Sequence, residues 1–215
     1  MLTVLVLASG GSALLSGCAP GDSWAEPHPA PTLVGAVGAG FLPESSPSPE
    51  ATVQPKAGSW DDVHPSNGLR VVLVTAGGDD PTRTLVSAVE SWATAENVEL
   101  RTVSAGDDHV GGIVQALEMK PDLVVSAGND LVDALAVVTP SHLEQDFLIV
   151  GAEIAEPTEN VTAVDWTGAS FRGVGLGAAS EYDAATFTPE RSERALRAGV
   201  ASVLHGQTGV VLWVD

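Results

Sequence analysis

One stretch, residues 70–80, constrains the fold of this chain more than any other. It begins with the apolar, β-branched run Arg-Val-Val-Leu-Val-Thr, continues with Ala-Gly-Gly-Asp-Asp, and leads into a helical pattern from Pro81. This succession is typical of the first strand of an α/β sheet. Open α/β sheets bind ligands at the carboxyl ends of their strands. We therefore expect a binding site in the loop that follows residue 75.

The same alternation of strand and helix continues to the end of the chain. We predict further strands over 97–103, 123–126, 147–150, 161–164 and 210–214, and helices over 82–95, 109–119, 130–138, 169–180 and 189–205. Short, continuously apolar strands that alternate with helices indicate a parallel sheet covered on both faces. The expected fold over residues 68–215 is therefore α/β, with a single doubly wound, mostly parallel sheet of the flavodoxin-like type.

The charge and the cysteine content exclude several classes of function. The formal net charge is −19 with only nine Lys and Arg, and phosphate binding needs clustered cations, so we expect no nucleic-acid partner. A single cysteine, Cys18, rules out an intramolecular disulfide and a cysteine-based zinc cluster. His64 and His109 each lie near two aspartates, but no two histidines have helical metal-binding spacing, so we expect no metal site.

The first residues have the pattern of a secretion signal. An apolar stretch over 2–15, too short to span a bilayer comfortably, ends in Leu15-Ser16-Gly17-Cys18. This tetrapeptide resembles the bacterial lipobox, in which the cysteine is diacylated and becomes the mature N-terminus. We expect residues 1–18 to be a lipoprotein signal peptide and Cys18 to anchor the protein to the extracytoplasmic face of the membrane. The alternative is an incidental buried thiol. Because signal peptides begin with positive charge and the first basic residue here is Lys56, we expect the true start codon to lie upstream.

Residues 19–67 contain most of the chain's fourteen prolines, together with many Gly and Ser residues. Such a composition favours an extended tether between the anchor and the domain. An apolar island at 33–42 interrupts it and either docks on the domain or stays loose.

Three segments together resemble the N-terminal lobe of basic membrane protein-type substrate-binding lipoproteins, the nucleoside-binding subunits of ABC importers with the type I periplasmic-binding fold. They are Val-Leu-Val-Thr-Ala-Gly-Gly-Asp-Asp at 72–80, Pro-Asp-Leu-Val-Val-Ser-Ala-Gly-Asn-Asp-Leu-Val-Asp-Ala-Leu at 121–135, and Asn-Val-Thr-Ala-Val-Asp-Trp-Thr-Gly-Ala-Ser-Phe-Arg-Gly-Val-Gly at 160–175. The resemblance implies a nucleoside-like ligand and an ABC permease as partner.

The chain departs from this family in two places. Thr82-Arg83-Thr84 stands where the family has Ser-Phe-Asn, which helps to hold the nucleoside. In addition, the residues after Ser180 are too few for the family's second lobe. Receptors of this kind bury the ligand between two lobes, so a single lobe offers half a cleft. We expect weak binding unless a permease or a second copy of the chain supplies the other wall.

Five residues are candidates for ligand binding. Asp79 and Asp80 follow the first strand, where they could accept hydrogen bonds from ribose hydroxyls; alternatively, Asp80 caps the helix that starts at Pro81. Asp133 matches an acidic position of the family, but it could equally be a surface residue. Asn129 is either a helix cap or a ligand contact. Trp166 could stack on a base or cover the core.

We expect no catalytic residue and no cofactor. Gly173 to Ala178 matches Gly-x-Gly-x-x-Ala, but the dinucleotide fingerprint belongs directly after the first strand, so we interpret these small residues as helix–sheet packing. The chain lacks nucleophile-elbow, Walker and zinc-protease motifs. The sequence thus favours a non-catalytic, membrane-anchored protein that binds or senses a small molecule. The alternative is a degenerate single-lobe protein that acts as an interaction or structural partner in the cell envelope.

Overall fold

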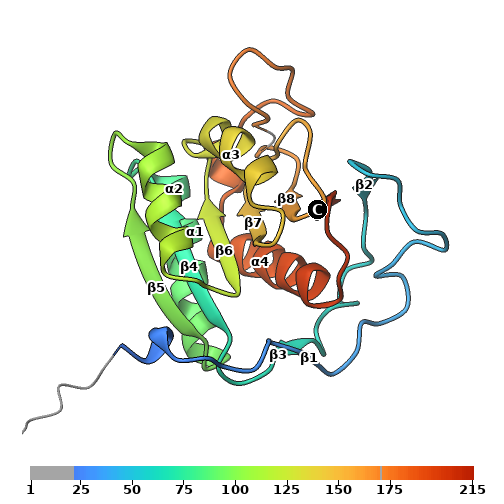
Figure 1. The fold of residues 1–215 in the computed structure, drawn as a ribbon. Helices are drawn as coiled ribbons and strands as arrows, with labels where there is room; N and C mark the ends of the chain where they lie inside the picture. The colour runs from blue at the N-terminus through green and yellow to red at the C-terminus, as the bar shows by residue number, and fades with distance from the viewer. Residues whose placement is uncertain (1–21, 170) are drawn as a thin grey trace, which may run out of the picture.

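A seven-stranded sheet, parallel at every pairing, forms the centre of the molecule. The computed structural model describes residues 22–169 and 171–215. The strands of the sheet are β2 (Thr52–Val53), β4 (Arg70–Thr75), β5 (Glu99–Ser104), β6 (Leu123–Ala127), β7 (Asp146–Val150), β8 (Val161–Asp165) and β9 (Val210–Trp213). They lie in the order β2-β9-β8-β7-β6-β4-β5 (Figure 1).

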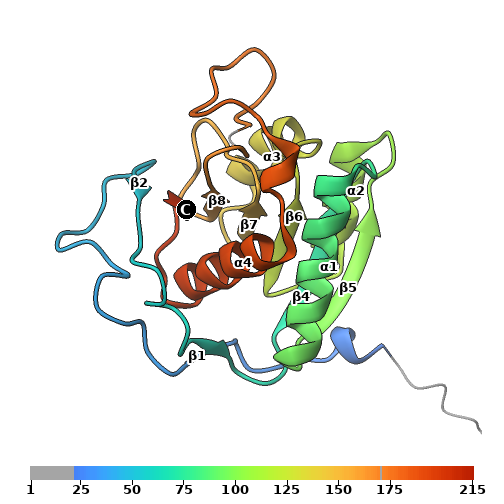
Figure 2. The same ribbon diagram turned by 180° about the vertical axis from the view of Figure 1, so that it is seen from behind.

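Within the described residues, four α-helices cover the sheet, two on each face. They are α1 (Asp80–Ala95), α2 (His109–Glu118), α3 (Val132–Val138) and α4 (Pro189–Leu204), and the 3₁₀ turns are η1 (Ser23–Ala25), η2 (Thr139–Ser141) and η3 (Ala184–Thr186). Helices α1 and α4 pack on one face (Figure 2), and α2 and α3 pack on the other (Figure 1). The expected doubly wound α/β fold is confirmed.

The central strands are buried on both sides, which explains their continuous apolar sequences. Along β4, Val71 and Leu73 point into the core beneath α1 and α4, whereas Val72 and Val74 point into the core beneath α2 and α3. All four side chains are fully buried. A strand of this kind cannot alternate apolar and polar residues, because neither of its faces meets water.

The strand order places a topological switch point between β4 and β6. From β4 the chain moves outward to β5, and it then crosses back to β6 on the other side of β4. The loops that follow β4 and β6 therefore diverge at the carboxyl edge of the sheet. This is the place where doubly wound folds form a ligand crevice.

The helix predicted over 169–180 is not formed. The described residues of this range and those up to 183 make an irregular loop that projects beyond the carboxyl edge (Figure 1). Gly173 and Gly175 have φ values of +124° and +81°, which glycine adopts readily and which interrupt a helix. The backbone N–H of Val174 donates to a carboxylate oxygen of Asp133 at 3.1 Å, so the loop is fixed to α3 instead.

Residues 22–69, here called the N-terminal strap, pack on the domain, in contrast to the extended tether expected over 19–67. The strap starts beside β5, crosses below the amino ends of the strands, and reaches the far edge of the sheet, where β2 pairs with β9 (Figure 1). Its own strands β1 (Leu33–Val34) and β3 (His64–Pro65) form an antiparallel pair. Proline fixes φ and lacks an N–H donor, which limits how much backbone pairing the strap can make. Beyond the pairing of β2 with β9, side chains attach the strap to the domain.

Buried aromatic side chains attach one part of the strap to the core. Phe41 and Trp60 are each 2% exposed, meet edge to face with ring centroids 6.3 Å apart, and join the core beneath α4. The apolar island at 33–42 thus docks on the domain, as one of the two expected alternatives.

A buried arginine attaches the other part. The Arg70 guanidinium, at the start of β4, donates to the carbonyl oxygens of Ser23, Trp24 and Glu26 at 2.7–3.2 Å. The Trp24 indole N–H in turn donates to Glu99 at 2.6 Å. These bonds hold η1 against the amino ends of β4 and β5.

Candidate functional site

A small cavity lies at the switch point, between the loops that follow β4 and β6. Its volume is about 180 Å³. Two of its lining residues, Asp79 and Asp130, are exposed, so the cavity is open to solvent. The residues that line it are Asp79, Pro81, Thr82, Gly128, Asn129, Asp130, Tyr182 and Phe187.

Two glycines allow the loops to approach each other closely. Gly77 (φ +72°) lies against Asp130, where a Cβ would be 2.3 Å from the carboxylate oxygen Oδ2. Gly128 (φ +89°) lies against Thr82, where a Cβ would be 2.9 Å from the hydroxyl oxygen. Both glycines combine a left-handed φ with a contact that excludes a side chain. Both glycines therefore help to form the cavity, because they let its two loops approach each other.

The two adjacent acids after β4 have different surroundings. Asp79 is the N-cap of α1 and accepts a hydrogen bond from the Thr82 N–H at 2.9 Å. Asp80 lies in the first turn of the helix, and its side chain, 88% exposed, pairs with Arg83. The expected cap at Asp80 is therefore wrong by one residue. Asp79 lines the cavity, whereas Asp80 faces the outer surface of α1.

Asn129 also lines the cavity, but it does not cap a helix. Helix α3 begins at Val132, and its N-cap residue Leu131 makes no side-chain capping bond. The side-chain oxygen Oδ1 of Asn129 is buried and has no hydrogen-bond partner among the described residues. A buried acceptor without a donor is costly, so this atom is available to a ligand.

The structure places the other two predicted residues away from the cavity. Asp133 binds the loop at Val174. Trp166 is completely buried: its indole N–H donates to the hydroxyl of Thr186 at 3.1 Å, and its ring lies 5.0 Å from that of Phe187. Of the two alternatives for Trp166, the structure has the one in which it covers the core, and stacking on a base is incompatible with this position because no face of the ring reaches solvent.

Sequence reasoning missed Tyr182 and Asp130. Tyr182, the only tyrosine of the chain, is 46% exposed and lies with its ring centroid 5.8 Å from that of Phe187. Burial, and then the negative charges of Asp79 and Asp130, raise the pKa of its hydroxyl above the usual range. Asp130 directly follows Asn129 in the sequence and could have been found as a further acid behind a strand. Tyr182 could not, because it lies in the region expected to follow a helix.

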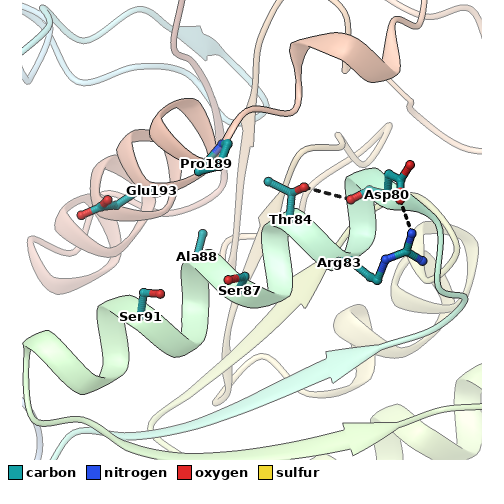
Figure 3. Close-up of a pocket in the computed structure, with 8 residues that line it drawn as sticks. All are labelled: Asp80, Arg83, Thr84, Ser87, Ala88, Ser91, Pro189 and Glu193. Carbon is teal, nitrogen blue, oxygen red and sulfur yellow. Dashed lines mark hydrogen bonds and ion pairs between the residues drawn. The ribbon is translucent and has the colours of Figure 1, made fainter.

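A second depression, of about 380 Å³, runs between α1 and α4 (Figure 3). Small side chains of α1, Ser87, Ala88 and Ser91, face Pro189 and Glu193 of α4 across it. The charged groups on its rim already have partners, since Arg83 pairs with Asp80 and Glu193 with Arg197. This groove follows from small residues between two helices, and the cavity at the switch point is the stronger candidate.

Among the residues described by the structure, no group of three or more His, Cys, Asp and Glu side chains could hold a metal ion. In the same part of the chain, no helix is long and apolar enough to cross a membrane. Cys18 lies outside the described residues.

No family model and no curated protein matches the chain. Several solved structures are similar. One is the solute-binding protein of an ABC transporter system from Aeropyrum pernix (19% identity, 46% of this chain and 29% of that chain, TM-score 0.37). Another is a fragment of a protein assigned as a lipoprotein from Peptoclostridium difficile (14% identity, 63% of this chain and 98% of that chain, TM-score 0.44). A third is a periplasmic ribose ABC transporter from Conexibacter woesei (15% identity, 69% of this chain and 55% of that chain, TM-score 0.34).

The match with the Aeropyrum pernix protein spans less than a third of that protein. At these identities and TM-scores, the likenesses carry no argument about ligand or activity. The functional argument therefore rests on the geometry of the cavity.

Proposed function

We propose that this chain is a non-catalytic binding or sensing protein for a small molecule, of the solute-binding lipoprotein type. The observation that supports the proposal is the cavity at the switch point between β4 and β6, lined by the buried, unpaired Oδ1 of Asn129. Doubly wound folds bind ligands at this place. The finer proposal, from the sequence resemblance, is a ligand of the nucleoside type in a relative of the basic membrane protein family.

The proposed anchor is a lipid on Cys18. Asp22 follows Cys18 by four positions in the chain, and an extended chain covers at most about 14 Å in four residue steps. The strap starts at the amino edge of the sheet, so an anchored domain would lie close to the membrane with its cavity turned away. This orientation favours sensing, or binding completed by a second copy, over direct delivery to a permease. Replacement of Cys18 with Ser should move the protein from the membrane fraction to the soluble fraction; a Cys18→Ser protein that stays in the membrane would contradict the anchor.

Calorimetric titration of the full chain with a panel of nucleosides, sugars and amines tests the binding function. We expect one saturable site of weak affinity, because the cavity is open on one side. Asn129→Leu should abolish binding, whereas Gln115→Leu, the same change on the exposed surface of α2, should leave it intact. The proposal fails if no compound of the panel binds, or if both variants bind alike.

A second function is favoured by the loop beyond the carboxyl edge. Val174 and Leu176 are 80% and 55% exposed there, and exposed apolar side chains next to each other mark interaction surfaces. An interaction partner in the cell envelope, or a second copy of the chain, would cover them. Sedimentation of the protein and of a Val174→Ser, Leu176→Ser variant distinguishes these cases: self-association that the variant loses supports the second copy, and a monomer in both excludes it.

A further inference from the structure

The polar groups of the switch-point cavity accept hydrogen bonds, and few donors meet them. Asn129 contributes a buried Oδ1 without a partner. Asp130 is exposed and makes no hydrogen bond and no ion pair with any described residue. Asp79 uses one oxygen, Oδ1, to cap α1, which leaves Oδ2 for another donor.

No cation faces these acceptors within the described part of the chain. None of the eight lining residues is Lys, Arg or His. The nearest arginine along the sequence, Arg83, is 64% exposed and bonds to Asp80 and to the carbonyl oxygen of Gly78 on the outer side of the helix. The contact of Asp130 with Gly77 meanwhile holds its carboxylate next to the loop after β4. Two carboxylates thus share one small cavity without a counter-charge.

Aromatic rings form the wall opposite these acids. Tyr182 and Phe187 lie with their ring centroids 5.8 Å apart, tilted by 48°, and Tyr182 stands at the solvent-exposed end of the pair. Burial, and then the negative charges of Asp79 and Asp130, raise the pKa of Tyr182, which is consistent with a ring close to both carboxylates. Aromatic faces attract cations within about 6 Å of the ring centroid.

Resting on the proposed small-molecule binding function, and in place of the nucleoside-type ligand that the sequence resemblance suggests, we propose that the cavity binds a small organic cation, a primary ammonium or guanidinium group on a short stem. Asp79 and Asp130 would pair with its charge, Asn129 Oδ1 would accept one of its N–H groups, and the ring of Tyr182 would contact its stem. Charge-assisted hydrogen bonds of this kind are among the strongest in proteins. The volume of about 180 Å³ is below that of sites for larger ligands, about 300–1,000 Å³, which favours a small group over a whole nucleoside.

The test is calorimetric titration of the full chain with butylammonium and butylguanidinium, and with the neutral probes butanol and adenosine, at low and at physiological salt. We expect the two cations to bind at both salt concentrations and the neutral probes not to bind. The variant Asp130→Asn should weaken cation binding at least about tenfold, the loss of one charge-assisted hydrogen bond. The control Asp62→Asn removes the same charge from an exposed residue of the strap and should have no effect.

The outcomes separate this inference from the proposed function. Binding of adenosine without binding of either cation would overturn the cation site and leave the binding function intact. No binding of any probe, together with failure of the wider panel, would overturn both. Equal loss of cation binding in Asp130→Asn and Asp62→Asn, or binding that disappears at physiological salt, would show general attraction to a protein of net charge −19 and would overturn the site.

Discussion

Polar side chains at the two edges of the sheet differ in whether they have hydrogen-bond partners inside the protein. At the amino edge, charged side chains hold the strap in place through partners on the domain. His28 bonds to Asp122 at 2.8 Å, and His64 bonds to Glu96 at 2.8 Å, while Arg70 satisfies three carbonyl oxygens. The rings of His28 and His64 and both terminal nitrogens of the Arg70 guanidinium thus have partners inside the molecule.

At the carboxyl edge, acceptors remain without donors. Asp130 and Asn129 Oδ1 have no partner among the described residues, and two glycines with left-handed φ hold the surrounding loops. The comparison indicates that the amino edge contributes stability and the carboxyl edge contributes binding. Substitutions at the two edges should therefore have different effects, and five of them measure the difference.

The largest effect is expected from Trp60→Ala in the strap. The side chain is 2% exposed, and loss of a buried Trp costs about 3–5 kcal/mol. Leu176→Ala at the carboxyl edge, where the side chain is 55% exposed, should cost less than about 0.5 kcal/mol. Urea unfolding followed by circular dichroism measures both. Similar small losses would show that the strap is not part of the cooperative core.

The next largest effect is expected from Arg70→Met. The arginine is 6% exposed, and its removal leaves three strap carbonyls without a donor, at a cost of about 3 kcal/mol. Arg83→Met removes an exposed ion pair next to the cavity and should cost at most about 0.5 kcal/mol. A loss below about 1 kcal/mol for Arg70→Met would mean that water replaces the guanidinium without penalty.

Acid should loosen the strap before it unfolds the domain. The hydrogen bonds from Arg101 and from the Trp24 N–H lower the pKa of Asp22 to about 2. Burial alone would raise the pKa of Glu96, but the hydrogen bonds from His64 and Arg197 outweigh it and lower this pKa below its usual value. Both carboxyl pKa values are lower in the folded state than in the unfolded state. These two carboxylates therefore stabilise the folded state fully when the pH is above the ordinary carboxyl pKa values, and this contribution is lost as the pH falls through their pKa values in the folded state. Hydrogen exchange of the strap amides should therefore accelerate as the pH falls below about 4, after correction for the intrinsic rate. Protection of the strap that stays constant down to about pH 2 would contradict this.

The smallest effect on stability is expected from Asp130→Asn. Without an internal partner, its loss should change the free energy of unfolding by less than about 0.5 kcal/mol. It should, however, lower the pKa of Tyr182 toward the ordinary value, because one of the two nearby negative charges is removed. Tyr182 is the only tyrosine, so absorbance titration at alkaline pH reports this group alone. An unchanged tyrosine titration would place Asp130 too far from the ring to share a ligand with it.

The sheet could be predicted from the sequence because its strands are short, continuously apolar and separated by helical patterns. Arg70–Thr75, for example, is a strand with the predicted bounds. Two of the candidate residues, Asp79 and Asn129, line the cavity because they lie in the loops that follow β4 and β6, and their binding of a ligand stays a prediction. Position after a strand is a local property, and local properties are visible in a sequence.

What the sequence did not reveal depends on contacts between distant residues. Small residues over 169–180 fit a packed helix as well as a loop, and only the bond from Val174 to Asp133 shows which one forms. Trp166 follows a strand as a ligand contact would, but Thr186 and Phe187 bury it. The docking of the strap depends likewise on a buried arginine that satisfies backbone carbonyls 44–47 positions away.

The pairing of β2 with β9 has a consequence for the order of events in folding. The register pairs Thr52 of β2 with Val211 of β9. During synthesis β2 therefore leaves the ribosome long before β9, the strand with which it pairs. Contacts between such distant residues form late, because closing a long loop costs entropy before the contacts repay it. Until then Phe41 and Trp60 are exposed, as a surface for chaperones or for aggregation. Because interactions that are absent from the folding transition state act mainly on the unfolding rate, we expect the docked strap to slow unfolding more than it speeds folding.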